Sequence, residues 1–503
     1  MSPSALADLH HDKAAVEPHS NGLRLSNGHT SVVASKQTEY LLDRNLHKSF
    51  PVVTGGSGNY LYLLDGRTVF DATGGAAVSC IGHGNKRVIK AVSTVMNTGI
   101  SYLASTFWAC EVVEELCKNL IHGTDGKMAR IYLTGSGQSP NLCAYPRWLM
   151  LSGSEAMEAA IKLARQVFYE SNPSTPRINF IAREGSYHGN TIGALGMSGF
   201  PLRRAPYEPF LMNNVHHVSS CNPYRQRADG ESDSSFVARK AAELEAKFQE
   251  LGPETVIAFV AEPVVGAALG CVPAVPGYLK AMKDVCHKHG ALFILDEVMS
   301  GMGRCGTLHA WQHEDVAPDL QTVGKGLGGG YQPVAAVLIS SRVVNTLLNG
   351  SGQFVHGQTY QGMPVQAAAA LEVQRIVQEE DLVDNVKRQG LYLEQCLRAR
   401  LADHPNVGDI RGRGLFWGLE FVKDKTTKEP FDPKLAVAQR VYNTSVSTPF
   451  NMTMYPGTGS ADGLKGDHVI LAPAYNVTKE DIEYIAQVAS DVVHQVFRKL
   501  GNL

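Results

Sequence analysis

The stretch that decides the fold is Ala291-Leu-Phe-Ile-Leu-Asp-Glu297, an apolar run followed at once by two carboxylates. A short, continuous apolar run is typical of a strand buried on both faces of a parallel sheet. Val256-Ile-Ala-Phe-Val-Ala-Glu262 shows the same pattern upstream. Because ligands on open parallel sheets bind beyond the carboxyl ends of strands, Glu262 and Asp296 are the first candidates for a functional site.

Further strands and helices alternate on either side of these runs. Similar apolar strands are predicted at 130–134 (RIYLT), 178–181 (INFI) and 334–339 (VAAVLI), and helices at 154–168 and 277–289. This alternation predicts an α/β domain around a largely parallel sheet. After about residue 377 the pattern changes to a helix over 379–401 and strands over 414–422 and 469–472, which indicates a separate smaller lobe.

Composition narrows the class of protein. The chain has 503 residues, 44% hydrophobic and 19% charged, with a formal net charge of -2 and no long block of one sign. These values do not favour nucleic-acid or anionic-membrane binding, so a small-molecule substrate is expected. The longest apolar stretch, 256–278, is interrupted by Glu262 and by prolines, and therefore predicts no transmembrane helix.

The cysteines and the N-terminus bear on the compartment. Nine cysteines lie scattered without the spacing of a zinc site or a disulfide framework, which favours reduced thiols and no metal. Residues 1–38 are rich in His, Ser and Asn and lack the apolar core of a secretory signal, while Asp8, Asp12 and Glu17 argue against a transit peptide. We interpret this segment as a disordered tail on a cytoplasmic protein.

A lysine lies in the glycine-rich segment Thr322-Val-Gly-Lys-Gly-Leu-Gly-Gly-Gly330. Small neighbours leave Lys325 open to a ligand, so it is a candidate Schiff-base nucleophile. A nucleotide-binding P-loop is excluded, because Gly326 follows the lysine and Asp319 occupies the position of the first glycine. On local grounds alone, a surface turn with a solvated lysine remains the competing interpretation.

An ordered set of motifs resolves this choice. Over roughly residues 40–500 the chain resembles the class III (omega-type) aminotransferases, which are pyridoxal 5'-phosphate (PLP) enzymes of fold type I. The motifs, in the family's order, are Gly153-Ser-Glu-Ala-Met-Glu-Ala-Ala160, Tyr187-His-Gly189, Glu262-Pro-Val264, Asp296-Glu-Val298, Gly324-Lys-Gly-Leu-Gly328, Gln358-Thr-Tyr-Gln-Gly362 and Arg411-Gly-Arg-Gly414.

The resemblance implies a fold and a division into domains. The fold is a large domain with a mostly parallel seven-stranded sheet, plus a small α/β domain built from both ends of the chain. We expect the tail at 1–38, the N-terminal segment of the small domain at 39–105, the large PLP-binding domain at 106–377 and the C-terminal part of the small domain at 378–503.

The resemblance also implies roles for particular residues around the cofactor. Lys325 would carry PLP and move the proton during transamination, and Asp296 would pair with the protonated pyridine nitrogen. Tyr187 and Val298 would cover the two ring faces. Gly153 and Ser154 would bind the phosphate at a helix start. No role for His188 follows.

Substrate contacts and assembly are implied in the same way. Arg411 would bind a substrate carboxylate, and Glu262 would contact the substrate side of the pocket or restrain an arginine there. Thr359 would reach the phosphate of a neighbouring subunit, which implies a homodimer with shared active sites. The implied activity is ping-pong transfer of an amino group from an amine or ω-amino acid to a 2-oxo acid or aldehyde. Decarboxylation or aminomutase chemistry, or an inactive binding subunit of the same fold, stay open as alternatives.

Two departures from the family pattern stand out. Met363 occupies a position where many relatives carry histidine. More seriously, sixteen residues at 137–152 (GQSPNLCAYPRWLMLS) separate the strand at 130–134 from Gly153, where relatives run on directly. Loops of this kind usually span ~2 to 6 residues. We interpret the segment as translated intron or a misplaced exon boundary, with a tolerated surface insertion or a lid over the substrate as alternatives.

Overall fold

The computed structural model describes residues 35–36, 40, 42, 45–135 and 153–501. The segment at 137–152 and residues 1–34 of the expected tail lie outside the described residues, so the interpretations of both stay predictions. Ser35–Lys36 form a short strand, β1, which pairs antiparallel with β2 (Phe50–Pro51). No helix of the described ranges is long and apolar enough to cross a bilayer.

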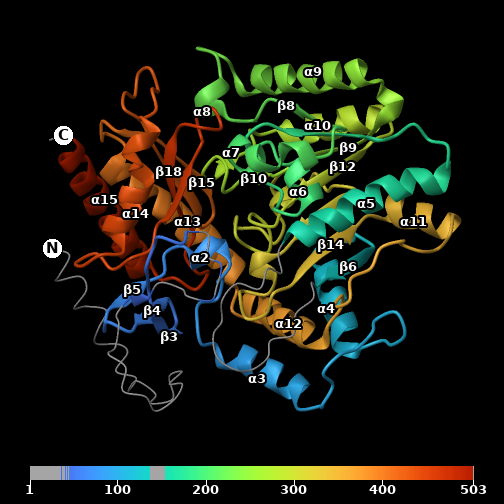
Figure 1. Ribbon diagram of the computed structural model, residues 1–503, viewed down its shortest axis with the longest axis horizontal. Coiled ribbons are helices and arrows are strands. Elements are labelled where there is room, and N and C mark those ends of the chain that lie inside the picture. Colours follow the sequence, from blue (N-terminus) through green and yellow to red (C-terminus); the bar gives the residue numbers. More distant parts are fainter. Residues whose placement is uncertain (1–34, 37–39, 41, 43–44, 136–152, 502–503) are drawn as a thin grey trace.

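A seven-stranded sheet of order β6-β14-β13-β12-β9-β7-β8 forms the centre of the larger lobe (Figure 1). Its strands are β6 (Arg130–Thr134), β7 (Asn179–Arg183), β8 (Val215–Val218), β9 (Val256–Ala261), β12 (Leu292–Asp296), β13 (Leu320–Val323) and β14 (Ala335–Ile339). Strands β13, β12, β9, β7 and β8 pair in parallel. β14, the run expected at 334–339, runs antiparallel to both of its neighbours, β13 and β6. The expected α/β fold with a mostly parallel sheet is confirmed.

Helices cover both faces of this sheet. On one face α5 (Gly153–Ser171) buries Ala156, Ala160 and Leu163 against residues of β9, β12 and β14. The opposite face is covered by α9 (Asp233–Leu251), α10 (Tyr278–Lys288), α4 (Glu111–His122) and α12 (Pro364–Glu379). Because both faces are buried, β9 is apolar throughout and β12 is apolar up to its last residue, which is why the sequence revealed them. The central strand β13 contains Gln321 and Thr322 and, like β8, was not predicted.

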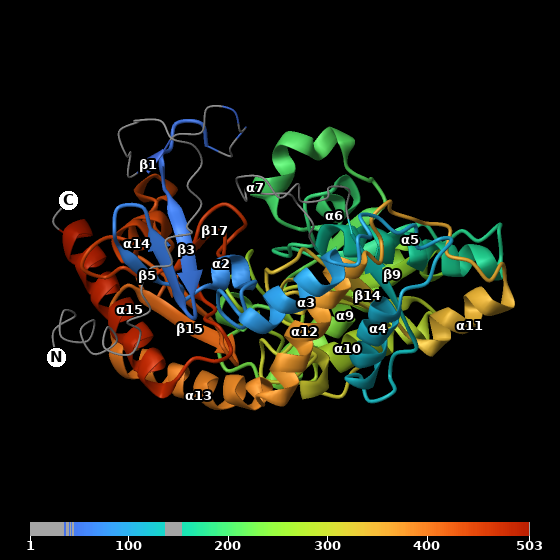
Figure 2. The same ribbon diagram turned by 90° about the horizontal axis from the view of Figure 1, so that it is seen from below.

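The second lobe combines the two ends of the chain. Its antiparallel sheet has the order β15-β16-β18-β17, with β15 (Val407–Arg413), β16 (Phe416–Phe421), β17 (Tyr455–Thr458) and β18 (Asp467–Leu471), and it packs on α13 (Leu382–Leu401), α14 (Val437–Ser445) and α15 (Lys479–Leu500). The N-terminal strands β3 (Val53–Ser57), β4 (Tyr60–Leu63) and β5 (Thr68–Phe70) lie beside these elements in Figures 1 and 2. Phe70 exchanges backbone hydrogen bonds with Asn451 and Thr453.

Several predicted boundaries differ from the structure by about one to three residues. The helix expected over 379–401 begins at Leu382, because α12 ends at Glu379 and Asp381 adopts a left-handed backbone with φ 49°. Apolar spacing continues across both helices, so the sequence pattern did not reveal the break. The expected division into domains remains a prediction.

Candidate functional site

Lys325 follows the end of β13 by one residue, Gly324, and is half-buried. Its backbone has φ 44°, a left-handed conformation between Gly324 and Gly326. Burial lowers the pKa of Lys325 to about 8, an effect that Asp296 and Glu262 oppose and Arg304 reinforces. The amine is therefore poised to lose its proton near neutral pH, which a solvated surface lysine would not do.

Asp296, the last residue of β12, has both carboxylate oxygens occupied. Oδ1 accepts hydrogen bonds from the backbone N–H of Val298 and from Oγ1 of Thr322, each at 3.1 Å. Oδ2 lies 2.8 Å from Nδ1 of His188. His188 therefore belongs to the candidate site, although the sequence analysis gave it no role. The one indication in the sequence was its position next to Tyr187.

Glu262 follows β9 and is 4% exposed. Its carboxylate accepts hydrogen bonds from the backbone N–H groups of Tyr187 at 3.0 Å and Gly266 at 3.1 Å. Burial raises its pKa, and Asp296 adds to the effect. No arginine of the described ranges forms an ion pair with this carboxylate. The contacts that the structure shows for Glu262 hold the loop that carries Tyr187.

The start of α5 approaches the Lys325 loop closely. A Cβ built on Gly153 would lie 2.3 Å from Val298 Cγ2, and one built on Gly324 would lie 3.5 Å from Val298 Cγ1 and 3.8 Å from the Gly153 Cα. Gly153, Val298 and Gly324 therefore converge. Ser154 is buried beside them, and its Oγ accepts a hydrogen bond from the backbone N–H of Asn190 at 3.0 Å.

Arg411 is buried away from this group. Its guanidinium forms ion pairs with Glu420 and with Asp409, the latter at 3.0 Å, and donates to the backbone carbonyls of Gly270, at 2.9 Å, and Leu269. It lines a separate cavity of about 350 Å³ that none of Lys325, Asp296 and Glu262 lines. Each acceptor that the structure shows for the Arg411 guanidinium is a group of the protein itself. The role of Arg411 in binding a substrate carboxylate stays a prediction.

Thr359 is exposed in the loop between α11 (Ser341–Asn349) and α12. The neighbouring Gln358 accepts a hydrogen bond through Oε1 from the backbone N–H of Gly135 at 3.1 Å, and the Tyr360 ring meets Tyr102 at 5.7 Å between centroids. Among the described residues, no hydrogen bond or ion pair joins Thr359 to Lys325. The contribution of Thr359 to the cofactor site of a second copy of the chain stays a prediction.

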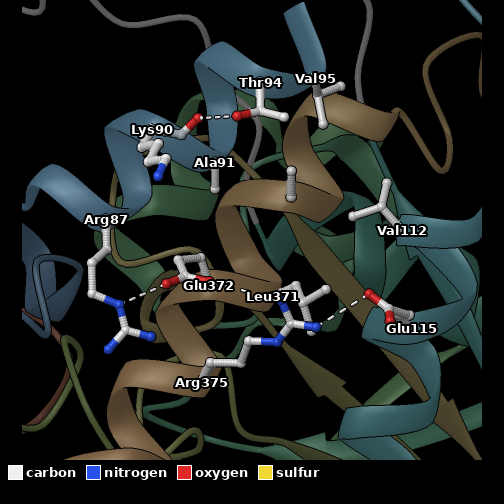
Figure 3. Close-up of a pocket in the computed structure, with 11 residues that line it drawn as sticks. Arg87, Lys90, Ala91, Thr94, Val95, Val112, Glu115, Leu371, Glu372 and Arg375 are labelled. Atoms are coloured by element: carbon white, nitrogen blue, oxygen red, sulfur yellow. Dashed lines mark hydrogen bonds and ion pairs between the residues drawn. The ribbon is translucent and has the colours of Figure 1, made fainter. Parts of the chain in front are cut away.

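A larger cavity of about 440 Å³ lies elsewhere, between α3 (Lys86–Met96), α4 and α12 (Figure 3). Its floor is aliphatic, and its arginines are paired within the wall: Arg87 with Glu372, and Arg375 with Glu115. None of the predicted site residues lines it. It therefore does not compete with the Lys325 group as the site of the chemistry.

The Lys325 group fits PLP. A half-buried lysine of lowered pKa, a buried strand-end carboxylate with three hydrogen-bond partners, and the start of α5, where Gly153 packs closely on Val298, bring an amine, an anion and the N–H groups of a helix start into one place. The carboxylate and the lysine sit at the carboxyl ends of adjacent parallel strands, where such sheets bind ligands.

Comparison with known proteins agrees with this geometry. The sequence profile described as aminotransferase class-III matches residues 41–493. An aminotransferase of Gibberella zeae is 50% identical, covering 90% of this chain and 89% of that protein, and an uncharacterized aminotransferase of Schizosaccharomyces pombe is 42% identical, covering 92% and 97%. The structure of an omega transaminase from Pseudomonas jessenii in complex with PMP superposes with a TM-score of 0.82 at 28% identity, covering 92% and 98%. The chain is an enzyme, and it belongs to the class III aminotransferases.

Proposed function

We propose that the protein binds PLP at Lys325 and transfers an amino group, in two half-reactions, from an amine or ω-amino acid donor to a 2-oxo acid or aldehyde acceptor. The observation that carries the proposal is the half-buried Lys325, with its pKa lowered to about 8, near the buried carboxylates of Asp296 and Glu262. The omega transaminase with bound PMP supports the choice of donor and cofactor.

The residues divide the work by their positions. When bound, PLP supplies an electron sink for the substrate carbanion. Nζ of Lys325, whose pKa burial lowers to about 8, would bind the cofactor and would take a proton from the substrate and return it. Asp296, oriented by Thr322, His188 and the Val298 amide, would pair with a positive charge on the ring nitrogen.

The remaining residues position the ring and the phosphate. Glu262 fixes the Tyr187 backbone, so that the tyrosine is held for contact with one ring face while Val298 serves the other. Gly153 and Ser154 at the start of α5 would bind the phosphate, because a helix start offers free N–H groups and the positive end of the helix dipole. Arg411 would have to leave Glu420 to reach a substrate carboxylate.

A homodimer with shared active sites is part of the proposal. Thr359 is exposed, and exposed aromatic residues gather in the segment that contacts Tyr360: Tyr102 is 44% exposed, Phe107 79% and Trp108 66%. Large apolar side chains on a surface mark interaction sites. A cytosolic location is also proposed, and the eight cysteines of the described ranges, all free thiols, support it.

Absorbance and turnover test the proposal. PLP-saturated protein is expected to show a visible band that disappears in Lys325→Ala and bleaches when an amine donor is added. A donor and acceptor panel is then run on the full chain and on a version lacking residues 137–152. A band without amino transfer, but with loss of carbon dioxide or isomerisation of the substrate, would favour decarboxylase or aminomutase chemistry. The absence of a band from both chains would overturn the proposal in favour of a binding subunit.

A further inference from the structure

Arg304 is a buried cation without a carboxylate partner. The residue is 1% exposed, and its Nη1 donates to the backbone carbonyls of Leu415 at 3.0 Å and Pro473 at 2.5 Å. Nε and Nη2 are buried, and apart from an interaction with the Tyr475 hydroxyl they have no hydrogen-bond acceptor in the described part of the chain. No ion pair of the described residues includes Arg304. Because burying an unpaired charge is costly, its position calls for a physical reason.

The position of Arg304 is next to the Lys325 loop. Its guanidinium lies 4.6 Å from the ring centroid of Tyr475, and the hydroxyl of that tyrosine would lie 3.0 Å from a Cβ built on Gly326. The Tyr475 ring of the smaller lobe therefore lies between the Arg304 guanidinium and the loop that carries Lys325. Met302, near Arg304 in the sequence, also contacts Gly326, with its Cβ 3.5 Å from the built Cβ.

The charged groups around Lys325 come from three elements. Asp296 follows from β12 and Glu262 from the end of β9, and both favour the protonated amine. Asp296 is itself held by His188. Among the described residues, Arg304, from the loop after β12, is the cation that influences Lys325; it opposes the two carboxylates, and its effect is smaller than that of either of them. Cys80, whose Sγ lies 3.4 Å from the Gly326 carbonyl oxygen, stays a neutral thiol because burial raises its pKa to about 12.

We propose that Arg304 is a positioning residue whose unpaired charge partly offsets Asp296 and Glu262 and so raises the fraction of the Lys325 amine that is unprotonated. The inference rests on the proposed function of Lys325. Without this cation, the two carboxylates would further stabilise the ammonium form of Lys325, which is neither a nucleophile nor a base. A carboxylate paired with Arg304 would cancel the effect of the Arg304 charge on Lys325, which gives a physical reason why Arg304 has no such partner among the described residues.

Chemical labelling of the PLP-free, full-length chain measures the effect directly. Acetylation of Lys325 by acetic anhydride is followed by peptide mass spectrometry as a function of pH, because only the neutral amine reacts. In Arg304→Gln the labelling midpoint is expected to rise by about one pH unit, which makes the neutral amine roughly tenfold scarcer at pH 7. Arg304→Lys, which keeps the charge, is expected to restore most of the wild-type midpoint.

Arg183 provides a matched control. It is equally buried, at 1% exposure, it stacks on Tyr278 at 5.6 Å, and no ion pair of the described ranges includes it, but it is not among the groups that influence Lys325. Arg183→Gln is expected to lower stability without moving the labelling midpoint. Arg304→Met, with an apolar chain of similar length, takes the place of Arg304→Gln if the glutamine variant does not fold.

Two results would overturn the inference. One is an unchanged midpoint in Arg304→Gln or Arg304→Met, and the other is an equal shift in Arg304→Lys, which would show that packing and not charge is responsible. Since labelling needs no cofactor, a shifted midpoint in a chain that never binds PLP would leave this inference standing and overturn the proposed function instead. In protein that does bind PLP, the pH midpoint of the visible band is expected to move in the same direction.

Discussion

Replacing Gly153 by alanine adds one methyl group where α5 begins. The new Cβ would lie 2.3 Å and 2.5 Å from the two γ-carbons of Val298, whereas carbon atoms in contact are normally about 3.5–4.0 Å apart. The helix start or Val298 must therefore move by roughly 1 Å. Overpacking of this kind typically costs about 1–3 kcal/mol. If the strain falls on the cofactor site, PLP binding weakens by roughly 5- to 150-fold.

Equilibrium titration with PLP, followed by absorbance, measures the change. The double variant Gly153→Ala with Val298→Ala is expected to recover part of the affinity, because it removes both γ-carbons and leaves only the Val298 Cβ, at 2.9 Å. Gly55→Ala serves as the control, since its Cβ would meet nothing closer than 3.6 Å. Wild-type affinity in Gly153→Ala, with the fold intact, would show that this helix start is not part of the cofactor site.

Three further predictions concern charge and assembly. Asp296→Asn is expected to retain PLP but to slow the single-turnover rate by on the order of 10²–10³, because the neutral amide cannot hold a cationic ring; a rate near that of the wild type would contradict this. Glu420→Gln is expected to lower stability at pH 7 by roughly 3–5 kcal/mol, by urea unfolding, because two arginines lose their buried partner. Burial raises the pKa of Glu420, but Arg411 and Arg225 outweigh this effect and lower the pKa overall. The stabilisation by the Glu420 carboxylate is therefore complete above pH ~4.3 and is lost as the pH falls. The loss of stability at acid pH should be smaller in Glu420→Gln, and an unchanged loss would refute the role of these ion pairs. If active sites are shared, mixing equal amounts of Thr359→Ala and Lys325→Ala subunits is expected to restore about a quarter of the active sites. About half of the dimers are then hybrids, and each hybrid has one intact site and one that carries both substitutions. No recovery of activity on mixing would argue against shared sites.

Five of the seven strands of the larger sheet and the order of the site motifs were predictable from the sequence. β9 is apolar along its whole length and β12 is apolar up to its last residue, so Glu262 directly after β9 and Asp296 at the end of β12 stood out. β8 (VHHV) and β13 (LQTV) contain polar residues and were not predicted. The glycines around Lys325 were equally visible. The antiparallel direction of β14 was not, because a strand buried on both faces is apolar in either direction.

The sequence by itself determined which residues are available for the chemistry: a lysine among glycines, strand-end carboxylates and a glycine-serine helix start. Only the tertiary structure decided how each of them is charged and paired. It placed His188 on Asp296, turned Glu262 toward the Tyr187 backbone, sequestered Arg411 with Glu420 and left Arg304 unpaired beside Lys325. The reason is that burial and the distances between charges set pKa values and ion pairs, and residues far apart in the chain acquire both only when the two lobes pack together.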